Sequence, residues 1–296
     1  MTPRSLLLID ADPVVQGYLS RLLKRDDREI RQVPGSKEAL DLLRTDPIDL
    51  VLAGQGNNGF DGLALLRRVR SIRPATKVIL TGESDPQRIL AAIRQSAFGY
   101  LHRPLAPGPL GELVQQALDC DTWQDDIRVV SARPDWITLD VRCKIDAADR
   151  TTNFLREITA HLSAQAGEDI ASAFRELLMN AIEHGGKNDP HKRVRTSILH
   201  TARSIIVHIH DPGTGFSLDF LPHAAISNPA DSPIRHVEVR AEEGRRPGGF
   251  GILLTRNLVD ELLYNERGNA VLFVKYLQGK AEERQIQPPM NADKHG

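Results

Sequence analysis

Over residues 4–120, short runs of apolar side chains alternate with longer segments in which apolar side chains recur at helical spacing. The short runs predict strands at residues 5–9, 29–33, 50–53, 78–81 and 99–102. The longer segments predict helices at residues 13–25, 36–44, 62–72, 86–95 and 109–120. Strict alternation of this kind indicates an α/β domain, in which a parallel sheet carries helices on both faces.

Beyond residue 132 the pattern changes to helices interleaved with pairs of strands. A strand at 137–144 precedes a helix that runs from Asp146, as its cap, to Ala164, and a second helix starts near Asp169. A further helix is predicted at 252–259. Two hairpins are predicted, one from residues 194–199 with 204–210 and one from 262–265 with 270–277. This order predicts an α+β sandwich, with helices stacked on one face of the sheet.

The two patterns divide the chain into a first domain at 1–120, a linker at 121–132, a second domain at 133–279 and a tail at 280–296. The linker is locally acidic and lacks a clean period. Trp123 can therefore pack on either domain, and a continuation of the preceding helix is an alternative. Residues 221–247 are polar and rich in proline and charge, which favours a mobile lid. The polar tail is predicted to be disordered.

Composition and charge exclude several classes of function. A formal net charge of -1 supplies no basic field for nucleic acid, and no helix-turn-helix module follows the first domain. The two cysteines, Cys120 and Cys143, imply no disulfide framework and fit a reducing cytosol. No segment approaches the roughly 18 apolar residues that span a bilayer, and the N-terminus lacks signal-peptide anatomy. We therefore expect a cytoplasmic protein that binds neither DNA nor a membrane directly.

The candidate chemistry begins in the predicted helix around residues 174–185. Glu176 and Asn180 are four residues apart, so one helical turn stacks them on the same face. A carboxylate and a carboxamide that point into one cleft can handle a proton and a divalent cation together. Polar residues at this spacing are more often a solvated helix face, so the pair alone is a weak signal.

Two glycine motifs follow this helix in the chain. Asp211 begins the segment Asp-Pro-Gly-Thr-Gly-Phe at the end of a predicted strand, and Gly-Gly-Phe-Gly at 248–251 opens a helical run. The first motif alone is usually an ordinary turn, and the second alone can be a flexible loop. In this order, the three pieces resemble the nucleotide site of the GHKL ATPase superfamily, which includes gyrase, Hsp90, MutL and histidine kinases, over about residues 133–277. Asn-Ala-Ile-Glu-His at 180–184 and the run from Gly248 to Leu262 are most similar to the branch of anti-sigma-factor serine kinases.

The resemblance implies a role for each matched residue. Glu176 would accept the proton of an attacking hydroxyl, and Asn180 would present its side-chain oxygen to the Mg²⁺ that bridges the phosphates of ATP. Asp211 would accept a hydrogen bond from the adenine amino group. Glycines would allow the backbone to approach the nucleotide at Gly213 and Gly215, and would line the phosphates at Gly249 and Gly251.

The first domain resembles a two-component receiver, of the flavodoxin-like class with five parallel strands. The resemblance is carried by Leu-Leu-Leu-Ile-Asp-Ala-Asp-Pro, by Asp-Leu-Val-Leu with Phe-Asp-Gly behind it, and by Gly-Tyr-Leu-His-Arg-Pro-Leu. Receivers place a phosphorylatable aspartate seven residues before the Asp-Gly pair, and that position is Gly54 here. The acidic pair that holds magnesium is Asp10 and Ala11, and the usual lysine is Arg103. Residues that match the two switch positions are Thr81 and Tyr100.

These substitutions predict a receiver that does not form an aspartyl phosphate, because Gly54 supplies no carboxylate nucleophile. One hypothesis is a permanently set state in which Arg103 pairs with Asp10 in the vacated pocket. The alternative, which we favour, is a docking or dimerisation module that kept the fold and lost the chemistry.

The combined resemblance implies an atypical response regulator whose output domain binds Mg-ATP. We expect it to be a protein serine/threonine kinase that phosphorylates an antagonist protein in a partner-switching pathway, and that can sequester a sigma factor or similar regulator. The alternative is an ATP-gated binding module that sequesters a protein partner without phosphoryl transfer. A histidine kinase is excluded, because no helical hairpin with a phosphoacceptor histidine precedes the ATPase domain. Both families imply a homodimer.

Overall fold

The computed structural model describes residues 3–54, 60–133, 135–215 and 251–277. Several predictions therefore fall outside the described residues. These are the lid at 221–247, the glycines Gly248 and Gly249 and the tail at 280–296.

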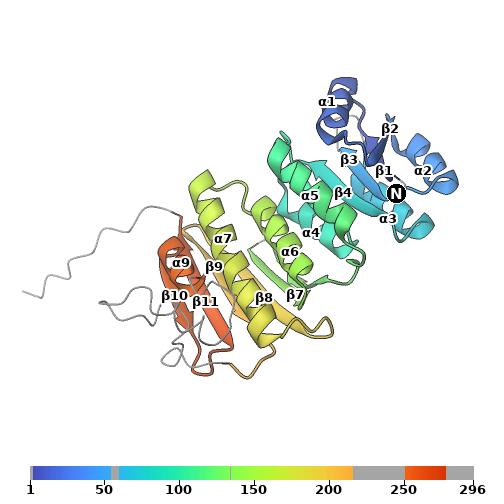
Figure 1. Ribbon diagram of the computed structural model, residues 1–296. Coiled ribbons are helices and arrows are strands. Elements are labelled where there is room, and N and C mark those ends of the chain that lie inside the picture. Colours follow the sequence, from blue (N-terminus) through green and yellow to red (C-terminus); the bar gives the residue numbers. More distant parts are fainter. Residues whose placement is uncertain (1–2, 55–59, 134, 216–250, 278–296) are drawn as a thin grey trace, which may run out of the picture.

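The first domain is built on a five-stranded parallel sheet of order β2-β1-β3-β4-β5 (Figure 1). Its strands are β1 (Arg4–Ile9), β2 (Arg28–Val33), β3 (Leu50–Gly54), β4 (Lys77–Gly82) and β5 (Gly99–His102). Its helices are α1 (Pro13–Leu23), α2 (Ser36–Thr45), α3 (Gly62–Ile72), α4 (Pro86–Arg94) and α5 (Pro107–Asp119). The predicted parallel sheet with helices on both faces is confirmed, and the strands agree with the prediction to within about one residue at each end.

The alternation of side chains along β1 explains why helices cover both faces of this sheet. Leu6 and Leu8 pack in one apolar cluster with side chains of α1 and α5, and Leu7 and Ile9 pack in another with side chains of α2, α3 and α4. All four are buried, as expected for a parallel strand that is covered on both sides.

Aspartate caps fix where three of these helices begin. Asp12 accepts a hydrogen bond from the amide of Val14 at 2.8 Å, as the sequence predicts for a residue before a proline at the first helical position. Asp61 and Asp85 cap α3 and α4 in the same way. The starts of α1, α3 and α4 are therefore set by local signals, whereas α2 and α5 begin without a side-chain cap.

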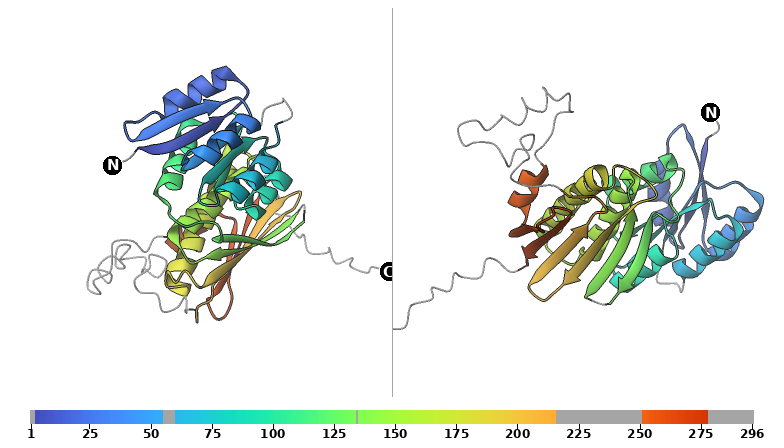
Figure 2. Two further views of the ribbon diagram at one scale, coloured as in Figure 1. Left: turned by 90° about the vertical axis from the view of Figure 1, so that its right-hand side faces the viewer. Right: turned by 90° about the horizontal axis from the view of Figure 1, so that it is seen from below.

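The second domain is a six-stranded antiparallel sheet of order β10-β11-β9-β8-β7-β6. Its strands are β6 (Ile127–Ala132), β7 (Trp136–Arg142), β8 (Arg193–His200), β9 (Ser204–His210), β10 (Glu261–Tyr264) and β11 (Ala270–Tyr276). Its helical segments are α6 (Ile145–Ile158), α7 (Ala164–Asn180), the π-helical turn η1 (Ala181–Gly185) and α9 (Gly251–Leu258). Figures 1 and 2 show these helices gathered on one face of the sheet, which confirms the predicted sandwich.

Several details differ from the prediction. The helix expected to run to Ala164 ends at Ile158. The segment assigned to the linker contains β6, which pairs with β7 at the edge of the second sheet, and α5 ends at Asp119 rather than continuing. Asp146 lies in the first turn of α6 instead of capping it. Helix α7 begins at Ala164, because the hydroxyl of Ser163 accepts from the amide of Ala166 and stabilises a polar first turn that carries no apolar period.

The two domains share a buried apolar interface. One contiguous cluster of buried side chains includes residues of the receiver-like domain together with residues of β6, β7 and α6. Its members at the interface are Ile89, Ile93, Tyr100, Ile127, Ile137, Phe154 and Ile158. Burial of this apolar surface favours a fixed arrangement of the two domains, at about 25 cal/mol for each Å² removed from water.

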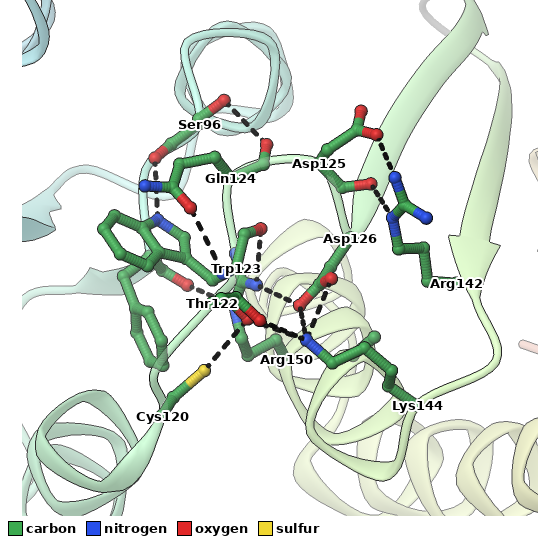
Figure 3. Close-up of polar contacts among 12 residues, drawn as sticks. Ser96, Cys120, Thr122, Trp123, Gln124, Asp125, Asp126, Arg142, Lys144 and Arg150 are labelled. Carbon is green, nitrogen blue, oxygen red and sulfur yellow. Dashed lines mark hydrogen bonds and ion pairs between the residues drawn. The ribbon is translucent and has the colours of Figure 1, made fainter. Parts of the chain in front are cut away.

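A cluster of polar contacts adjoins this interface, and Figure 3 shows Ser96, Trp123 and Arg150 among the residues that form it. Trp123 packs on the first domain: its indole donates to the carbonyl of Ser96 at 3.3 Å, and the guanidinium of Arg70 lies 5.0 Å from its ring centre. From α6, the buried Arg150 donates to the carbonyls of Phe98 at 3.0 Å and Trp123 at 3.1 Å. Trp123 therefore attaches the segment between the domains to the first domain, and Arg150 of α6 attaches the same segment to the second domain.

Candidate functional site

Helix α7 presents Glu176 and Asn180 on one face, as predicted, and both side chains are half-buried. Gly251, the first residue of α9, lies against them. A β-carbon at Gly251 would be 2.6 Å from a carboxylate oxygen of Glu176 and 3.5 Å from the amide nitrogen of Asn180. The structure thus brings together three predicted site residues that are up to 75 positions apart in the chain.

Within the described residues, the polar atoms of Glu176 and Asn180 are available to a ligand. No residue in the described part of the chain forms a hydrogen bond or an ion pair with either side chain. Half-buried polar groups in proteins normally have partners. The carboxylate of Glu176 can accept a proton, and the carboxamide oxygen of Asn180 can bind a hydrated cation.

Asp211 lies directly after β9 and contacts the carboxyl end of the helical layer. Its carboxylate accepts a hydrogen bond from the amide of Gly213 at 2.7 Å. Burial raises the pKa of Asp211, and the Gly213 amide and the nearby His210 partly oppose that rise. A β-carbon at Gly185, in η1, would overlap the Asp211 carboxylate. Asp211 therefore reaches the end of the helical segment only because residue 185 is glycine.

The sequence prediction missed Gly185 as a site residue, together with the π-helical turn that contains it. A regular helix was expected through residue 185, whereas η1 widens the last turn, with the amide of Gly186 donating to the carbonyl of Ala181 at 2.8 Å. Turns of this type are frequent at functional sites. The available signal was the Gly185–Gly186 pair directly after the helical period.

Gly213 and Gly215 are required by contacts within the chain itself. A β-carbon at Gly213 would be 2.8 Å from both a carboxylate oxygen of Asp211 and the Cα of Gly185. Gly215 has a φ of 84°, a conformation that favours glycine, and a β-carbon there would overlap the carbonyl of Arg267. Gly249, the remaining predicted phosphate-binding glycine, lies outside the described residues.

The pocket at the carboxyl end of the parallel sheet holds a buried ion pair. Arg103, which follows β5, pairs with the buried Asp10 and donates to the hydroxyl of Thr81 at 3.3 Å. A β-carbon at Gly54 would overlap both the guanidinium of Arg103 and the carboxylate of Asp10. Ala11 is exposed beside the pocket. The pairing that the sequence suggested is therefore present, and it occupies the space beside residue 54.

Comparison with known protein families assigns both halves. Residues 6–115 match the response regulator receiver domain, and residues 143–275 match the histidine kinase-like ATPase domain. The chain therefore contains a response regulator receiver domain followed by a histidine-kinase-like ATPase domain.

Relatives of the first half are found among bacterial response regulators. The chain is 31% identical over 106 residues to the Fimbriae Z protein of Salmonella typhimurium, covering 35% of this chain and 50% of that protein. It is 30% identical over 119 residues to the response regulator protein PilR of Pseudomonas aeruginosa, covering 40% of this chain and 27% of that one. The chain thus spans half or less of the length of these relatives.

A solved structure is similar over the same half. The signal receiver domain of an HD domain-containing protein from Pseudomonas fluorescens Pf-5 is 28% identical, with a TM-score of 0.38, covering 40% of this chain and 89% of that chain. Separately, among the described residues no helix is both long enough and apolar enough to cross a membrane.

Proposed function

We propose that the ATPase-like domain binds Mg-ATP and transfers the terminal phosphoryl group to a serine or threonine of an antagonist protein in a partner-switching pathway. The observation that carries the proposal is the convergence of Glu176 and Asn180 on Gly251, with both side chains lacking a partner among the described residues. The match to the histidine-kinase-like ATPase family supports nucleotide binding.

Each residue is given a role that its chemistry allows. Glu176 serves as the base for the attacking hydroxyl, because a carboxylate with no partner in the described part of the chain is free to take a proton. Asn180 holds Mg²⁺ through its side-chain oxygen, since magnesium prefers oxygen ligands. Gly251 at the start of α9 offers the backbone amides of a helix amino end, which favour an anion. Mg²⁺ supplies charge neutralisation for the phosphates when it is bound.

The nucleotide-specific part of the proposal rests on Asp211. Its carboxylate is half-buried beside Gly185, one helical turn beyond Asn180, and within the described part of the chain it accepts one amide hydrogen bond. It therefore retains acceptor capacity for the amino group of an adenine ring.

We also propose that the receiver does not form an aspartyl phosphate. Residue 54 is glycine, and the Arg103–Asp10 pair occupies the space in which a side chain at that position would lie. Incubation with acetyl phosphate and Mg²⁺ is expected to leave the protein unlabelled. A label on the receiver that is lost on acid treatment, as an acyl phosphate is, would contradict this part of the proposal.

The kinase proposal is tested by binding and transfer assays on the full chain. Asn180→Ala is expected to weaken Mg-ATP binding, whereas Glu176→Gln spares binding and slows transfer by roughly 10²–10⁴-fold, the usual contribution of a positioned base. Glu29→Gln, which changes an exposed glutamate of the receiver that pairs with Arg31, is the control. If wild type binds ATP but transfers phosphate to no protein of its own cell extract, the second candidate is favoured.

That second candidate is an ATP-gated module that sequesters a protein partner, an antagonist or a sigma-like regulator, without transfer. It is favoured by the fact that the residues proposed to bind nucleotide and those proposed to act on it lie on the same helix face. A homodimer is part of either proposal and is tested by the mass of the protein in solution with and without ATP.

A further inference from the structure

Two segments of the receiver, just after β4 and at the end of β5, form hydrogen bonds with Glu157 in the last turn of α6. The buried carboxylate of Glu157 accepts a hydrogen bond from the backbone amide of His102 at 2.7 Å, and it lies 2.8 Å from the Nδ1 atom of the same residue. The hydroxyl of Ser84, just after β4, donates to the backbone carbonyl of Glu157 at 3.0 Å. Both contacts cross from one domain to the other.

These contacts adjoin the ion pair in the receiver pocket. His102 and Arg103 are consecutive, and the amide of Arg103 donates to the carbonyl of Gly82 at 2.9 Å. The Arg103 side chain pairs with Asp10 and bonds to Thr81. The backbone that holds Glu157 is therefore positioned by the pair that occupies the vacated phosphoacceptor pocket.

A second anchor holds the first half of α6. The guanidinium of Arg150 is buried, donates to the carbonyls of Ala97 at 3.3 Å and Phe98 at 3.0 Å, and lies 4.6 Å from the Phe98 ring centre. Because α6 is attached at Arg150 and again at its last turn, it has little freedom to rotate or slide relative to the receiver.

An adjacent face of α6 contacts the helix that carries the candidate site. Asp149 of α6 pairs with Arg175 of α7 at 2.8 Å, and Arg175 immediately precedes Glu176. Arg156 of α6 pairs with Glu168 of α7 at 3.0 Å. Figure 1 shows α6 lying between the receiver and α7. One helix therefore joins the receiver pocket to the proposed ATP site.

We infer that the receiver acts as a permanent positioning element for the ATP site, through Arg103, His102 and Glu157 to α6, and that it does so without being phosphorylated. The Asp10–Arg103 pair holds the end of β5 in one state, and α6 transmits that state to Glu176 and Asn180. The part of this inference that concerns ATP affinity rests on the proposed function. Glu157 is a positioning residue, since it contacts no proposed ligand.

The physical basis is the cost of leaving buried polar groups unpaired. Removing the Glu157 side chain deprives the His102 amide of its acceptor and frees the last turn of α6. Removing Arg103 leaves Asp10 buried and uncompensated, which loosens the end of β5 that carries His102. Both substitutions disturb the contact between His102 and Glu157, one from the receiver and one from α6. Their effects on α7 should therefore be less than additive in the double variant.

The test uses the full chain with Glu157→Ala, Arg103→Ala, the double variant and Ser84→Ala as a milder change. Amide hydrogen exchange of α6 and of the second half of α7 is measured, together with the Kd for Mg-ATP. Exchange in α7 is expected to rise and ATP binding to weaken about fivefold or more in each single variant, within the usual range of coupling between sites. Glu157→Gln keeps an acceptor for the His102 amide, so its α7 exchange and its Kd for Mg-ATP should stay close to those of the wild type.

Matched controls are Glu29→Gln and Arg44→Ala, which break exposed ion pairs of the receiver away from α6. They are expected to change neither measurement. The inference is overturned if Glu157→Ala and Ser84→Ala loosen the Ser84–His102 region while α7 exchange stays at the wild-type level. If wild type binds no ATP, the proposed function fails, and α7 exchange alone still decides whether the receiver positions α7.

Discussion

Arg103 and Asp10 form an ion pair at the carboxyl end of the parallel sheet, directly against Gly54. Asp10 is buried, and its other oxygen accepts from the amide of Asp12 at 3.0 Å. The guanidinium of Arg103 thus occupies the space in which a side chain at position 54 would lie. Within this pair, the guanidinium of Arg103 compensates the charge of the buried Asp10 carboxylate.

We expect Gly54→Ala to destabilise the protein by about 1–3 kcal/mol, the usual cost of overpacking. The new methyl group would overlap Arg103 and Asp10, so the pair must separate or shift. The free energy of unfolding from urea titration measures this. Gly17→Ala in α1 is the control, because open space surrounds a β-carbon there, and it is expected to be neutral or stabilising. Equal effects of the two substitutions would contradict the prediction.

Arg150→Met should cost about 3–5 kcal/mol of the free energy of unfolding. The substitution removes a donor from the carbonyl of Phe98 and one of two donors from the carbonyl of Trp123, which keeps the amide of Asp126 at 3.1 Å. It also removes one partner of Asp126, which keeps the ammonium of Lys144 at 3.0 Å. Arg128→Met is the control, since that guanidinium is exposed at the edge of the sheet and Arg195 also pairs with its partner Asp140. A loss below 1 kcal/mol at Arg150 would show that this contact contributes little.

Glu157 should give the protein a pH dependence of stability. Burial raises the pKa of its carboxyl, although hydrogen bonds and the charge of His102 act in the opposite direction. The native state then holds the proton more tightly than the unfolded chain, so the free energy of unfolding falls as pH rises from the ordinary glutamate pKa to the raised one.

Glu157→Gln cannot ionise and should remove this part of the slope. Urea titrations at several values between about pH 4 and pH 7 measure it. Glu29→Gln, an exposed glutamate of the receiver, is expected to keep the wild-type slope. Superimposable stability–pH curves for wild type and Glu157→Gln would refute the assignment.

Gly185→Ala should weaken Mg-ATP binding by about tenfold or more, because an added methyl group would displace the Asp211 carboxylate that is proposed to recognise adenine. Nucleotide affinity measured by calorimetry tests this. Gly167→Ala near the start of α7, where a β-carbon meets open space, should bind ATP as wild type does. Unchanged affinity in Gly185→Ala would remove Asp211 from the nucleotide site.

Local signals in the sequence were enough to predict most elements of both domains, although β6 and the π-helical turn η1 were missed. Asp12, Asp61 and Asp85 cap their helices through atoms two or three residues away, and the apolar period of each strand is complete within the strand itself. Glu176 and Asn180 could be placed on one helix face for the same reason, since a helical turn is a local structure.

Only the tertiary structure decided which surfaces these elements share. That β6 belongs to the second sheet, that Trp123 packs on the receiver, and that Arg150 and Glu157 of α6 bond to receiver backbone all depend on contacts between residues 5 to 55 positions apart. The approach of Gly185 to Asp211 is of the same kind. Tertiary contacts of this kind produce no periodic pattern in the sequence. Each contact depends on two residues from separate segments, and neither residue alone indicates its partner.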